Sequence, residues 1–256
     1  MGIAELFTLE GKTAVVTGGS RGIGLMIAQG FVEAGADVYI SSRKAEVCEK
    51  VAAELGCHAI PADLSSDEGV EYLAQQLQSR EERIHILVNN AGNAWGAPFD
   101  EFPMSAFDRV WNLNVKALFH LTQLLRPQLK AAASLDDPAR VINIGSIDGI
   151  HVPMMDNFSY SASKAAVHQL TRHMAKELVQ DKITVNAIAP GLFPSQMTRW
   201  AFETEGAEEL VSTTVPIGRS GRPEDMAGTA IYLSSRAGAF LTGSIVVVDG
   251  GTANLK

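Results

Sequence analysis

Short apolar runs alternate along the chain with longer helical patterns, and this alternation limits the possible folds more than any other feature. The runs are rich in β-branched residues and nearly continuous, which is typical of strands covered on both faces. Strands joined by connections too long for hairpins form a parallel, doubly wound sheet. We expect strands at 13–17, 38–41, 58–60, 84–88, 141–144, 183–188 and 245–248, and helices at 22–34, 44–54, 67–80, 104–131, 158–179 and 223–234.

No linker or repeat interrupts this pattern, so we predict one α/β domain over residues 1–256, with a seven-stranded parallel sheet and helices on both faces. A chain of 256 residues with 46% hydrophobic content can bury a core without disulfides. The least regular stretch, 191–216, has no clear core pattern, which is typical of a substrate lid.

Charge and cysteine usage exclude several classes of protein. The 29 acidic and 21 basic residues give a net charge of −8, so the chain lacks the basic field of a nucleic-acid-binding protein. Cys48 and Cys57 have no metal-ligand spacing, so we expect no metal site, and they fit a reducing compartment. There is no signal-peptide pattern and no run long enough to span a membrane. We therefore expect a cytoplasmic protein that binds no membrane.

A glycine-rich turn directly follows the first expected strand and opens the first helix. It reads Thr17-Gly18-Gly19-Ser20-Arg21-Gly22-Ile23-Gly24. Glycines let the backbone approach a pyrophosphate, and the helix start offers free N–H groups to phosphate. The spacing of Gly18, Gly22 and Gly24 matches neither G-x-G-x-x-G nor a P-loop. An ordinary turn is the alternative, but the strand-to-helix context favours a dinucleotide site.

The end of the second strand indicates which dinucleotide binds. An NAD site usually has an acid there for the ribose 2′-OH, whereas an NADP site has a cation for the 2′-phosphate. Here the strand is followed by Ser42 and Arg43, and Arg21 lies in the glycine turn. Two guanidinium groups can hold a phosphate, so we predict NADP. The alternative is that Arg43 and Lys44 are ordinary solvated charges.

Three residues further along form a catalytic pattern. Tyr160 and Lys164 lie four apart on one helix face, where the ammonium and an oxidised nicotinamide would lower the tyrosine pKa. Ser146 directly follows a strand, at the edge of a parallel sheet where ligands bind. Tyr160 and Lys164 alone could be an exposed surface pair. Asn114, within the 104–131 helix, could be purely structural, because a buried asparagine must be hydrogen-bonded.

These motifs resemble the short-chain dehydrogenase/reductase family, whose members have a Rossmann fold, over residues 11–251. The resemblance rests on the glycine turn, Asn-Asn-Ala-Gly at 89–92, the Asn-Ser-Tyr-Lys set, Pro-Gly at 190–191 and Val-Asp-Gly-Gly at 248–251. It implies that Tyr160 is the general acid in carbonyl reduction and that Ser146 polarises the carbonyl. Lys164 would bind the nicotinamide ribose and lower the tyrosine pKa, and Asn114 would hold a water in a proton relay.

The resemblance also implies the contacts of NADP(H). Asp63 and Leu64 would flank the adenine, Asn90 and Ala91 would lie along the ribose, and the loop from Pro190 would meet the carboxamide. The full expected set is Gly18, Ser20, Arg21, Gly22, Ile23, Gly24, Ser42, Arg43, Asp63, Leu64, Asn90, Ala91, Gly92, Tyr160, Lys164, Pro190, Gly191, Phe193 and Ser195. The segments 19–30, 134–137 and 190–199 are similar to the rhamnolipid-associated β-ketoacyl reductases of bacteria.

The expected substrate pocket is apolar, which favours a hydrophobic ketone or a 3-oxoacyl thioester over a sugar acid. Some of these residues could instead be core or subunit contacts, and Arg199 could reach a carboxylate. The expected pocket walls are Trp95, Ile150, Val152, Met154, Met155, Phe158, Phe193, Met197, Trp200 and Phe202. Carrier-dependent relatives tend to have arginines before the fifth and sixth strands, whereas this chain has Asp136, Asp137 and Asp181, so docking of an acyl carrier protein is doubtful.

We therefore expect an NADPH-dependent ketoreductase acting on a small apolar carbonyl compound. The alternatives are an alcohol, polyol or steroid dehydrogenase of the same family, an epimerase or dehydratase, and a non-catalytic NADP sensor. The stretches 104–131 and 158–179 are apolar around too much of their circumference for a solvent-facing role. In the family these helices build a dimer bundle, so we expect a homodimer or homotetramer.

Overall fold

Seven parallel strands form one sheet in the order β3-β2-β1-β4-β5-β6-β7. The computed structural model describes residues 2–203 and 206–255. From β1 the chain adds β2 and β3 on one side and then β4 to β7 on the other, which is the doubly wound arrangement. The predicted fold class is confirmed. The strands are β1 (Thr13–Thr17), β2 (Asp37–Ser41), β3 (His58–Ala59), β4 (Ile86–Asn89), β5 (Ala139–Ile144), β6 (Ile183–Pro190) and β7 (Ile245–Val248).

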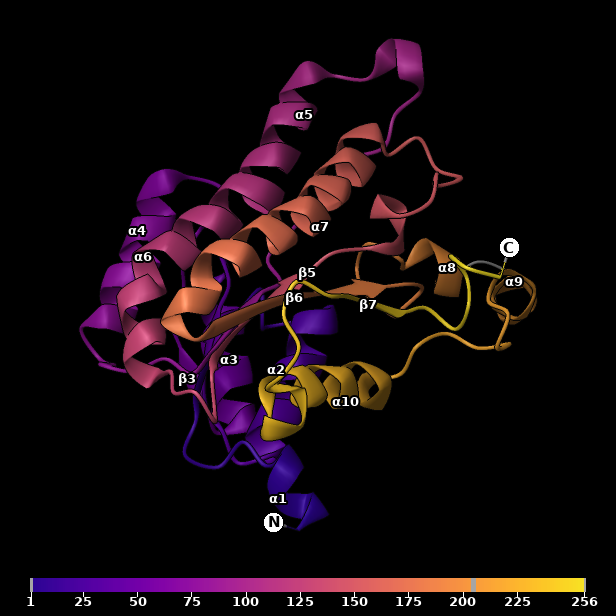
Figure 1. Cartoon of the computed structure of the whole chain (residues 1–256). Coiled ribbons are helices and arrows are strands. Elements are labelled where there is room, and N and C mark those ends of the chain that lie inside the picture. Colours follow the sequence, from indigo (N-terminus) through magenta and orange to yellow (C-terminus); the bar gives the residue numbers. More distant parts are fainter. Residues whose placement is uncertain (1, 204–205, 256) are drawn as a thin grey trace.

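Alternate strand residues point to opposite faces of the sheet, and both sets are apolar, so helices cover both faces. Two buried clusters result: Val15 and Leu87 face α4, α6 and α7, whereas Val16 and Ile40 face α2, α3 and α10 (Figure 1). The helices are α1 (Ile3–Phe7), α2 (Gly22–Glu33), α3 (Ala45–Leu55), α4 (Asp67–Gln78), α5 (Met104–Trp111), α6 (Ala117–Ala132), α7 (Phe158–Leu178), α8 (Trp200–Glu203), α9 (Ala207–Thr214) and α10 (Pro223–Ser234).

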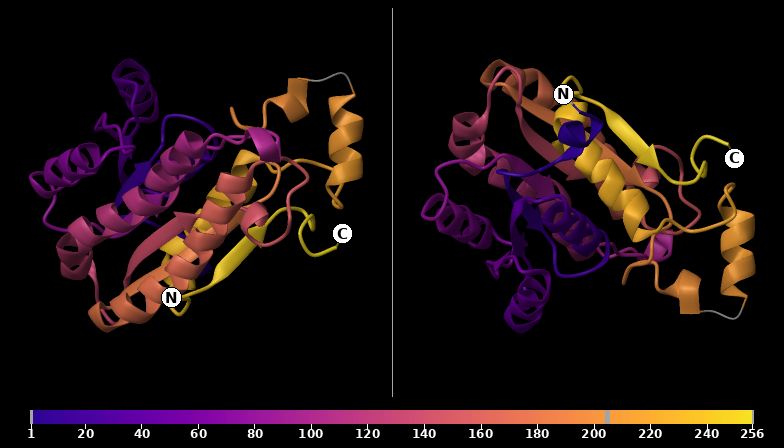
Figure 2. Two further views of the ribbon diagram at one scale, coloured as in Figure 1. Left: turned by 90° about the horizontal axis from the view of Figure 1, so that it is seen from above. Right: turned by 90° about the horizontal axis from the view of Figure 1, so that it is seen from below.

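The helix expected over 104–131 is present from Met104 to Ala132, and the π-helical turn Asn112–Lys116 lies within it, between α5 and α6. The stretch 191–216, where no helix was expected, contains the short helices α8 and α9. Both views in Figure 2 show α8 and α9 at the same end of the molecule as the C-terminus. Within the described part of the chain, no helix has the length and apolar character needed to cross a membrane.

Close packing of α2 against α10 depends on Gly30. A Cβ at this position would lie 2.5 Å from the Cβ of Ala227, which is too close for two carbon atoms. Gly228, one residue further along α10, is exposed and would meet nothing within 4 Å. The two glycines therefore test packing and helix propensity separately.

We predict that Gly30→Ala lowers the free energy of unfolding by about 1–2 kcal/mol, because overpacking outweighs the gain in helix propensity. Gly228→Ala should raise it by about 0.5–1 kcal/mol through propensity alone. Urea denaturation of the two variants measures both effects. Equal stabilisation by both substitutions would show that α2 and α10 are not in tight contact.

Candidate active site

The loops that follow β1, β4, β5 and β6 all lie at one edge of the sheet, because parallel strands end on the same side. The expected site residues are distributed over these loops and the helices that begin there. The structure thereby brings Gly18, Asn90, Ser146 and Ser195 to a common edge although they are far apart in sequence. This edge is where open α/β sheets bind ligands.

The glycine turn is built tightly onto the end of β2. Gly18 and Gly22 adopt φ angles of 67° and 53°, which other residues rarely adopt. The Gly18 N–H donates to the Ser41 carbonyl over 2.7 Å. A Cβ at Gly24 would lie 2.3 Å from the Gly18 carbonyl oxygen, so α2 can approach the turn only with glycine there. Because no side chain caps the start of α2, its first N–H groups are available to phosphate.

Thr17 ties the loop after β4 to this turn. Its hydroxyl accepts hydrogen bonds from the backbone N–H of Asn90 at 2.9 Å and of Ala91 at 3.0 Å, and it donates to the Val88 carbonyl. The Asn90 side-chain amide in turn donates to the carbonyls of Thr17 and Gly18. Asn90 thus braces the glycine turn. Thr17 was not among the predicted site residues, since as the last residue of a β-branched run it resembles any strand residue.

The predicted phosphate-binding residues lie beside this turn. Ser42 has a buried hydroxyl with no hydrogen-bond partner among the described residues. Arg21 and Arg43 are both exposed. Ser20 is buried within the turn, and Ile23 packs against the core beneath it. An unpaired hydroxyl and two exposed guanidinium groups in these neighbouring segments fit the 2′-phosphate of NADP.

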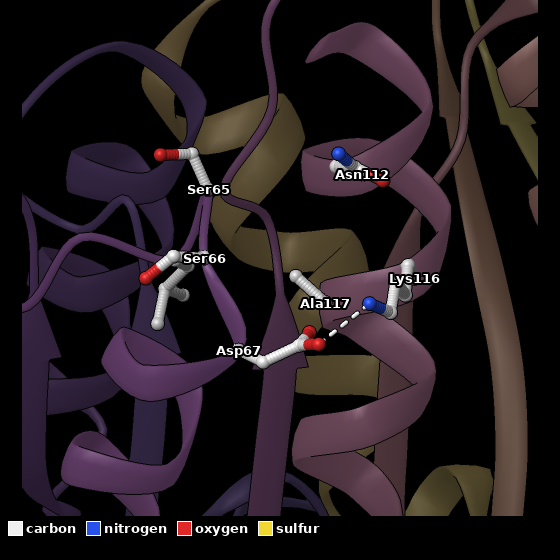
Figure 3. Close-up of a pocket in the computed structure, with 7 residues that line it drawn as sticks. Ser65, Ser66, Asp67, Asn112, Lys116 and Ala117 are labelled. Atoms are coloured by element: carbon white, nitrogen blue, oxygen red, sulfur yellow. Dashed lines mark hydrogen bonds and ion pairs between the residues drawn. The ribbon is translucent and has the colours of Figure 1, made fainter. Parts of the chain in front are cut away.

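A polar pocket of about 160 Å³ lies beside Leu64, between the start of α4 and the π-helical turn. Figure 3 shows its lining residues, with the Lys116 ammonium paired to Asp67 across it at 2.6 Å. Leu64 is buried, whereas the Asp63 carboxylate is exposed and accepts hydrogen bonds from the backbone and hydroxyl of Ser65. Both predicted adenine contacts are therefore next to this opening.

Ser146, Tyr160 and Lys164 meet at the start of α7. The Ser146 hydroxyl accepts a hydrogen bond from the Asp148 backbone N–H at 3.1 Å and lies close enough to Tyr160 to act on the pKa of its phenol. The Lys164 ammonium donates to the Ile144 carbonyl at 2.7 Å and lies 5.5 Å from the centre of the Tyr160 ring. Ser146 and Lys164 are buried, and Tyr160 is partly exposed. This arrangement brings a hydroxyl, a phenol and an ammonium to one place.

Burial dominates the titration of this group. It raises the pKa of Tyr160 to about 12, although the Ser146 hydroxyl acts in the opposite direction. Burial also lowers the pKa of Lys164 to about 8, although the Asp148 carboxylate opposes this. In the chain alone, desolvation of the phenolate outweighs any effect of the Lys164 ammonium. The expected lowering of the Tyr160 pKa by Lys164 together with an oxidised nicotinamide stays a prediction.

Asn114 lies in the π-helical turn between α5 and α6 and acts as a bridge. Its amide donates to the Asn93 carbonyl and to the Ser163 hydroxyl, both at 3.0 Å, and its Oδ1 accepts from the Asn93 N–H at 2.9 Å. A Cβ at Gly92 would lie only 3.2 Å from this oxygen. The side chain therefore ties the loop after β4 to α7. This is the purely structural role that the sequence left open for Asn114 beside a role in catalysis. π-Helical turns often mark functional sites.

The loop after β6 is fixed by its own contacts. Pro190 ends the strand, the Gly191 N–H donates to the Val248 carbonyl, and a Cβ at Gly191 would strike Asp249. Ser195 lies against the glycine turn, 3.4 Å from where a Cβ of Gly22 would lie. Phe193 is wrongly placed among the pocket walls, because its side chain is 2% exposed in the core, directly against Gly221.

The other expected pocket walls differ in exposure. Val152 and Met154 are almost fully exposed, at 91% and 98%, so neither packs against a pocket in the chain alone. The Trp95 ring lies under the Arg109 guanidinium, and Phe158 contacts Phe99 edge-on. Four further residues are partly exposed or half-buried: Ile150, Met155, Met197 and Phe202. The side chain of Trp200 lies outside the described residues. Arg199 is paired with Glu203, which occupies its charge.

His168 lies on α7 under the catalytic group. It is 4% exposed, and a Cβ at Gly145 would lie 2.2 Å from its Nε2. Burial, with Lys164 and Arg172 nearby, lowers its pKa to about 4. Because the unfolded chain takes up this proton near pH 6.5, stability is present above that pH and is lost as the pH falls toward 4.

We predict that His168→Gln flattens the loss of stability between pH 6.5 and pH 4. The histidine accounts for about 3 kcal/mol of that loss, given the size of the shift. Denaturant unfolding at several pH values measures it. The difference in stability between wild type and variant should be constant from pH 7 to 8. A parallel acid limb in both proteins would contradict the prediction.

Comparison with known proteins places this geometry in a family. The family model described as enoyl-(acyl carrier protein) reductase matches residues 18–253. A rhamnolipid-biosynthesis 3-oxoacyl-[acyl-carrier-protein] reductase of Pseudomonas aeruginosa is 52% identical, covering 96% of this chain and 97% of its own length. The 7alpha-hydroxysteroid dehydrogenase of Escherichia coli K12 is 35% identical, covering 95% of this chain and 94% of its own length.

Solved structures agree with this assignment. A Pseudomonas aeruginosa RhlG/NADP active-site complex superposes with a TM-score of 0.95 at 51% identity, covering 97% of this chain and 99% of its own. A Burkholderia cenocepacia gluconate 5-dehydrogenase in complex with NADP and tartrate gives 0.88 at 30% identity, with full coverage of both chains. The chain therefore belongs to the short-chain dehydrogenase/reductase family of oxidoreductases.

Proposed function

We propose that the protein uses NADPH to reduce the ketone of a 3-oxoacyl thioester or a similar apolar carbonyl compound to a secondary alcohol. The observation that carries this proposal is the meeting of Ser146, Tyr160 and Lys164 beside a glycine turn flanked by two guanidinium groups. The relatives that match most of the chain include a 3-oxoacyl reductase and an NADP complex, which supports it.

The residues of the site fit NADP in three places. The tight turn around Gly18 and Gly24 and the uncapped start of α2 suit the pyrophosphate. Arg21, Arg43 and the unpaired Ser42 hydroxyl suit the 2′-phosphate. The pocket beside Leu64 suits the adenine end. When bound, NADPH supplies the hydride.

The protein's own groups manage the proton and the carbonyl. With a pKa near 12, Tyr160 keeps its proton at neutral pH and can donate it to the carbonyl oxygen as negative charge develops there. The Ser146 hydroxyl, which also acts on the pKa of Tyr160, polarises the same oxygen. Lys164 uses one of its three N–H donors on Ile144, which leaves two for the nicotinamide ribose. Asn114 supports this group by holding the loop after β4 against α7.

We also propose that the protein is a cytoplasmic homodimer or homotetramer. The helical segment around the π-helical turn leaves Trp111 and Phe119 40% and 44% exposed, which is unusual for large apolar side chains on a stable monomer. Phe240 is fully exposed, and the edge strand β7 is only partly covered. Covering these faces with further copies would bury them. Cys48 and Cys57 are both free thiols, which suits a reducing compartment.

The acids before β5 and β6 bear on whether an acyl carrier protein can dock. Asp137 is paired with Lys12 and Arg140, and Asp181 is paired with Arg126 and Lys130. Asp137 and Asp181 therefore do not present free negative charge to an acidic carrier, and the cations beside them are engaged, whereas Asp136 is exposed. Charge steering should neither favour nor oppose a carrier strongly.

We predict that Tyr160→Phe lowers the rate of NADPH oxidation with acetoacetyl-CoA by about 10²- to 10⁴-fold, because the proton donor is lost. NADPH binding, followed by fluorescence titration, should persist. Tyr232→Phe is the matched control, since this half-exposed tyrosine lies on α10, and its rate should match wild type. Binding of NADPH by the wild type without oxidation by any ketone tested would support a sensor instead.

We further predict that acetoacetyl groups linked to an acyl carrier protein and to coenzyme A are reduced with kcat/KM values within about tenfold of each other, equivalent to less than about 1.4 kcal/mol. The paired charges around Asp181 provide no strong steering in either direction. Steady-state kinetics with both substrates measure the ratio. A preference for the carrier of several hundredfold would contradict it.

A further inference from the structure

One side-chain contact connects the glycine turn with the lid. The Nη1 of Arg21 donates a hydrogen bond to Oε1 of Gln196, which is 175 positions further along the chain. Both side chains are at the surface. Arg21 is the residue just before α2, and Gln196 follows the loop after β6. None of the expected cofactor contacts includes Gln196.

Gln196 is held in place by a compact turn. The Ser195 backbone N–H and hydroxyl each lie 3.0 Å from the Thr198 hydroxyl, which also bonds to the Phe193 carbonyl. The Phe193 ring is buried in the core and anchors the start of this turn. Because Ser195 also touches the glycine turn at Gly22, the backbone that carries Gln196 is fixed relative to Arg21.

The turn that carries Arg21 lies beside the strand end where a 2′-phosphate would bind. The glycine turn is hydrogen-bonded to the end of β2 through Ser41, and a Cβ at Gly19 would strike Ile40. The next residues after β2 are Ser42, with its unpaired hydroxyl, and the exposed Arg43. The turn that carries Arg21 is therefore packed against the strand end that carries the other predicted phosphate ligands.

We infer that Gln196 is a positioning residue for cofactor selectivity, which holds the Arg21 guanidinium ready for the 2′-phosphate of NADP. The amide oxygen takes one of the five N–H donors of the arginine, so four remain for phosphate. Being neutral, it restrains the long side chain without cancelling its charge, which lowers the entropic cost of binding. This inference rests on the proposed use of NADP.

The test measures binding of two fragments that lack nicotinamide, 2′,5′-ADP and 5′-ADP, by calorimetry. Gln196→Ala should weaken 2′,5′-ADP by about three- to tenfold, the size of one hydrogen bond, and leave 5′-ADP unchanged. Gln196→Glu should weaken 2′,5′-ADP further, because its carboxylate pairs with Arg21 and repels the phosphate. In an Arg21→Ala background, Gln196→Ala should have no additional effect.

Gln76→Ala is the matched control. Gln76, near the end of α4, accepts a hydrogen bond from Arg80 just beyond that helix, so the substitution removes a similar contact elsewhere in the chain. It should not alter binding of either fragment. Equal weakening of both fragments by Gln196→Ala, or no weakening, would overturn the inference while leaving NADP use intact. If wild type bound 5′-ADP as tightly as 2′,5′-ADP, the proposed NADP preference itself would fail, and the inference with it.

Discussion

The hydroxyl of Thr17 is the interaction on which the active site depends. It receives two consecutive backbone N–H groups from the loop after β4, while its own strand leads into the glycine turn. Without it, two N–H groups at the sheet edge would lose their partner, which is costly when they are shielded from water. Asn90 returns the support by donating to the carbonyls at the start of the turn. The cofactor cradle is therefore a property of two adjacent strands together, and neither loop has this shape alone.

Desolvation sets the charge state beneath this cradle. Tyr160, Lys164 and His168 all lie in the first half of α7. The pKa of the tyrosine is raised and those of the lysine and histidine are lowered, so each shift favours the neutral form of the side chain. A dry site of this kind favours neutral partners until a charged ligand enters. A protonated phenol is also the form that ketone reduction requires, since the phenol must give its proton to the product oxygen. The same burial thus costs acid stability at His168 and prepares Tyr160 for the reductive direction.

Much of this could be predicted from the sequence, and the limits follow from physical causes. Buried parallel strands consist of continuous β-branched runs, so their positions in the chain and the loops after them could be located. The glycine spacing identified the turn. The π-helical turn around Asn114 could not, because its helical pattern is the same as that of its neighbours and only contacts with Asn93 and Ser163 distinguish it. Phe193 could not be assigned to the core either, since only the space left by Gly221 decides it.

At the opposite edge of the sheet, the role of charged residues likewise depends on contacts that the sequence does not reveal. Arg140 is the second residue of β5 and is 1% exposed, and a guanidinium that deep must be paired. Asp137 and the carbonyls of Pro138 and Ser235 provide its partners, and Asp137 also pairs with Lys12. Asp137 therefore belongs to a buried ionic group at the amino ends of the strands. In the sequence it looks like a surface acid next to a second one, Asp136, and only its contacts with Lys12 and Arg140 distinguish it. The sign of a residue's charge predicts a docking surface only where its partners are known.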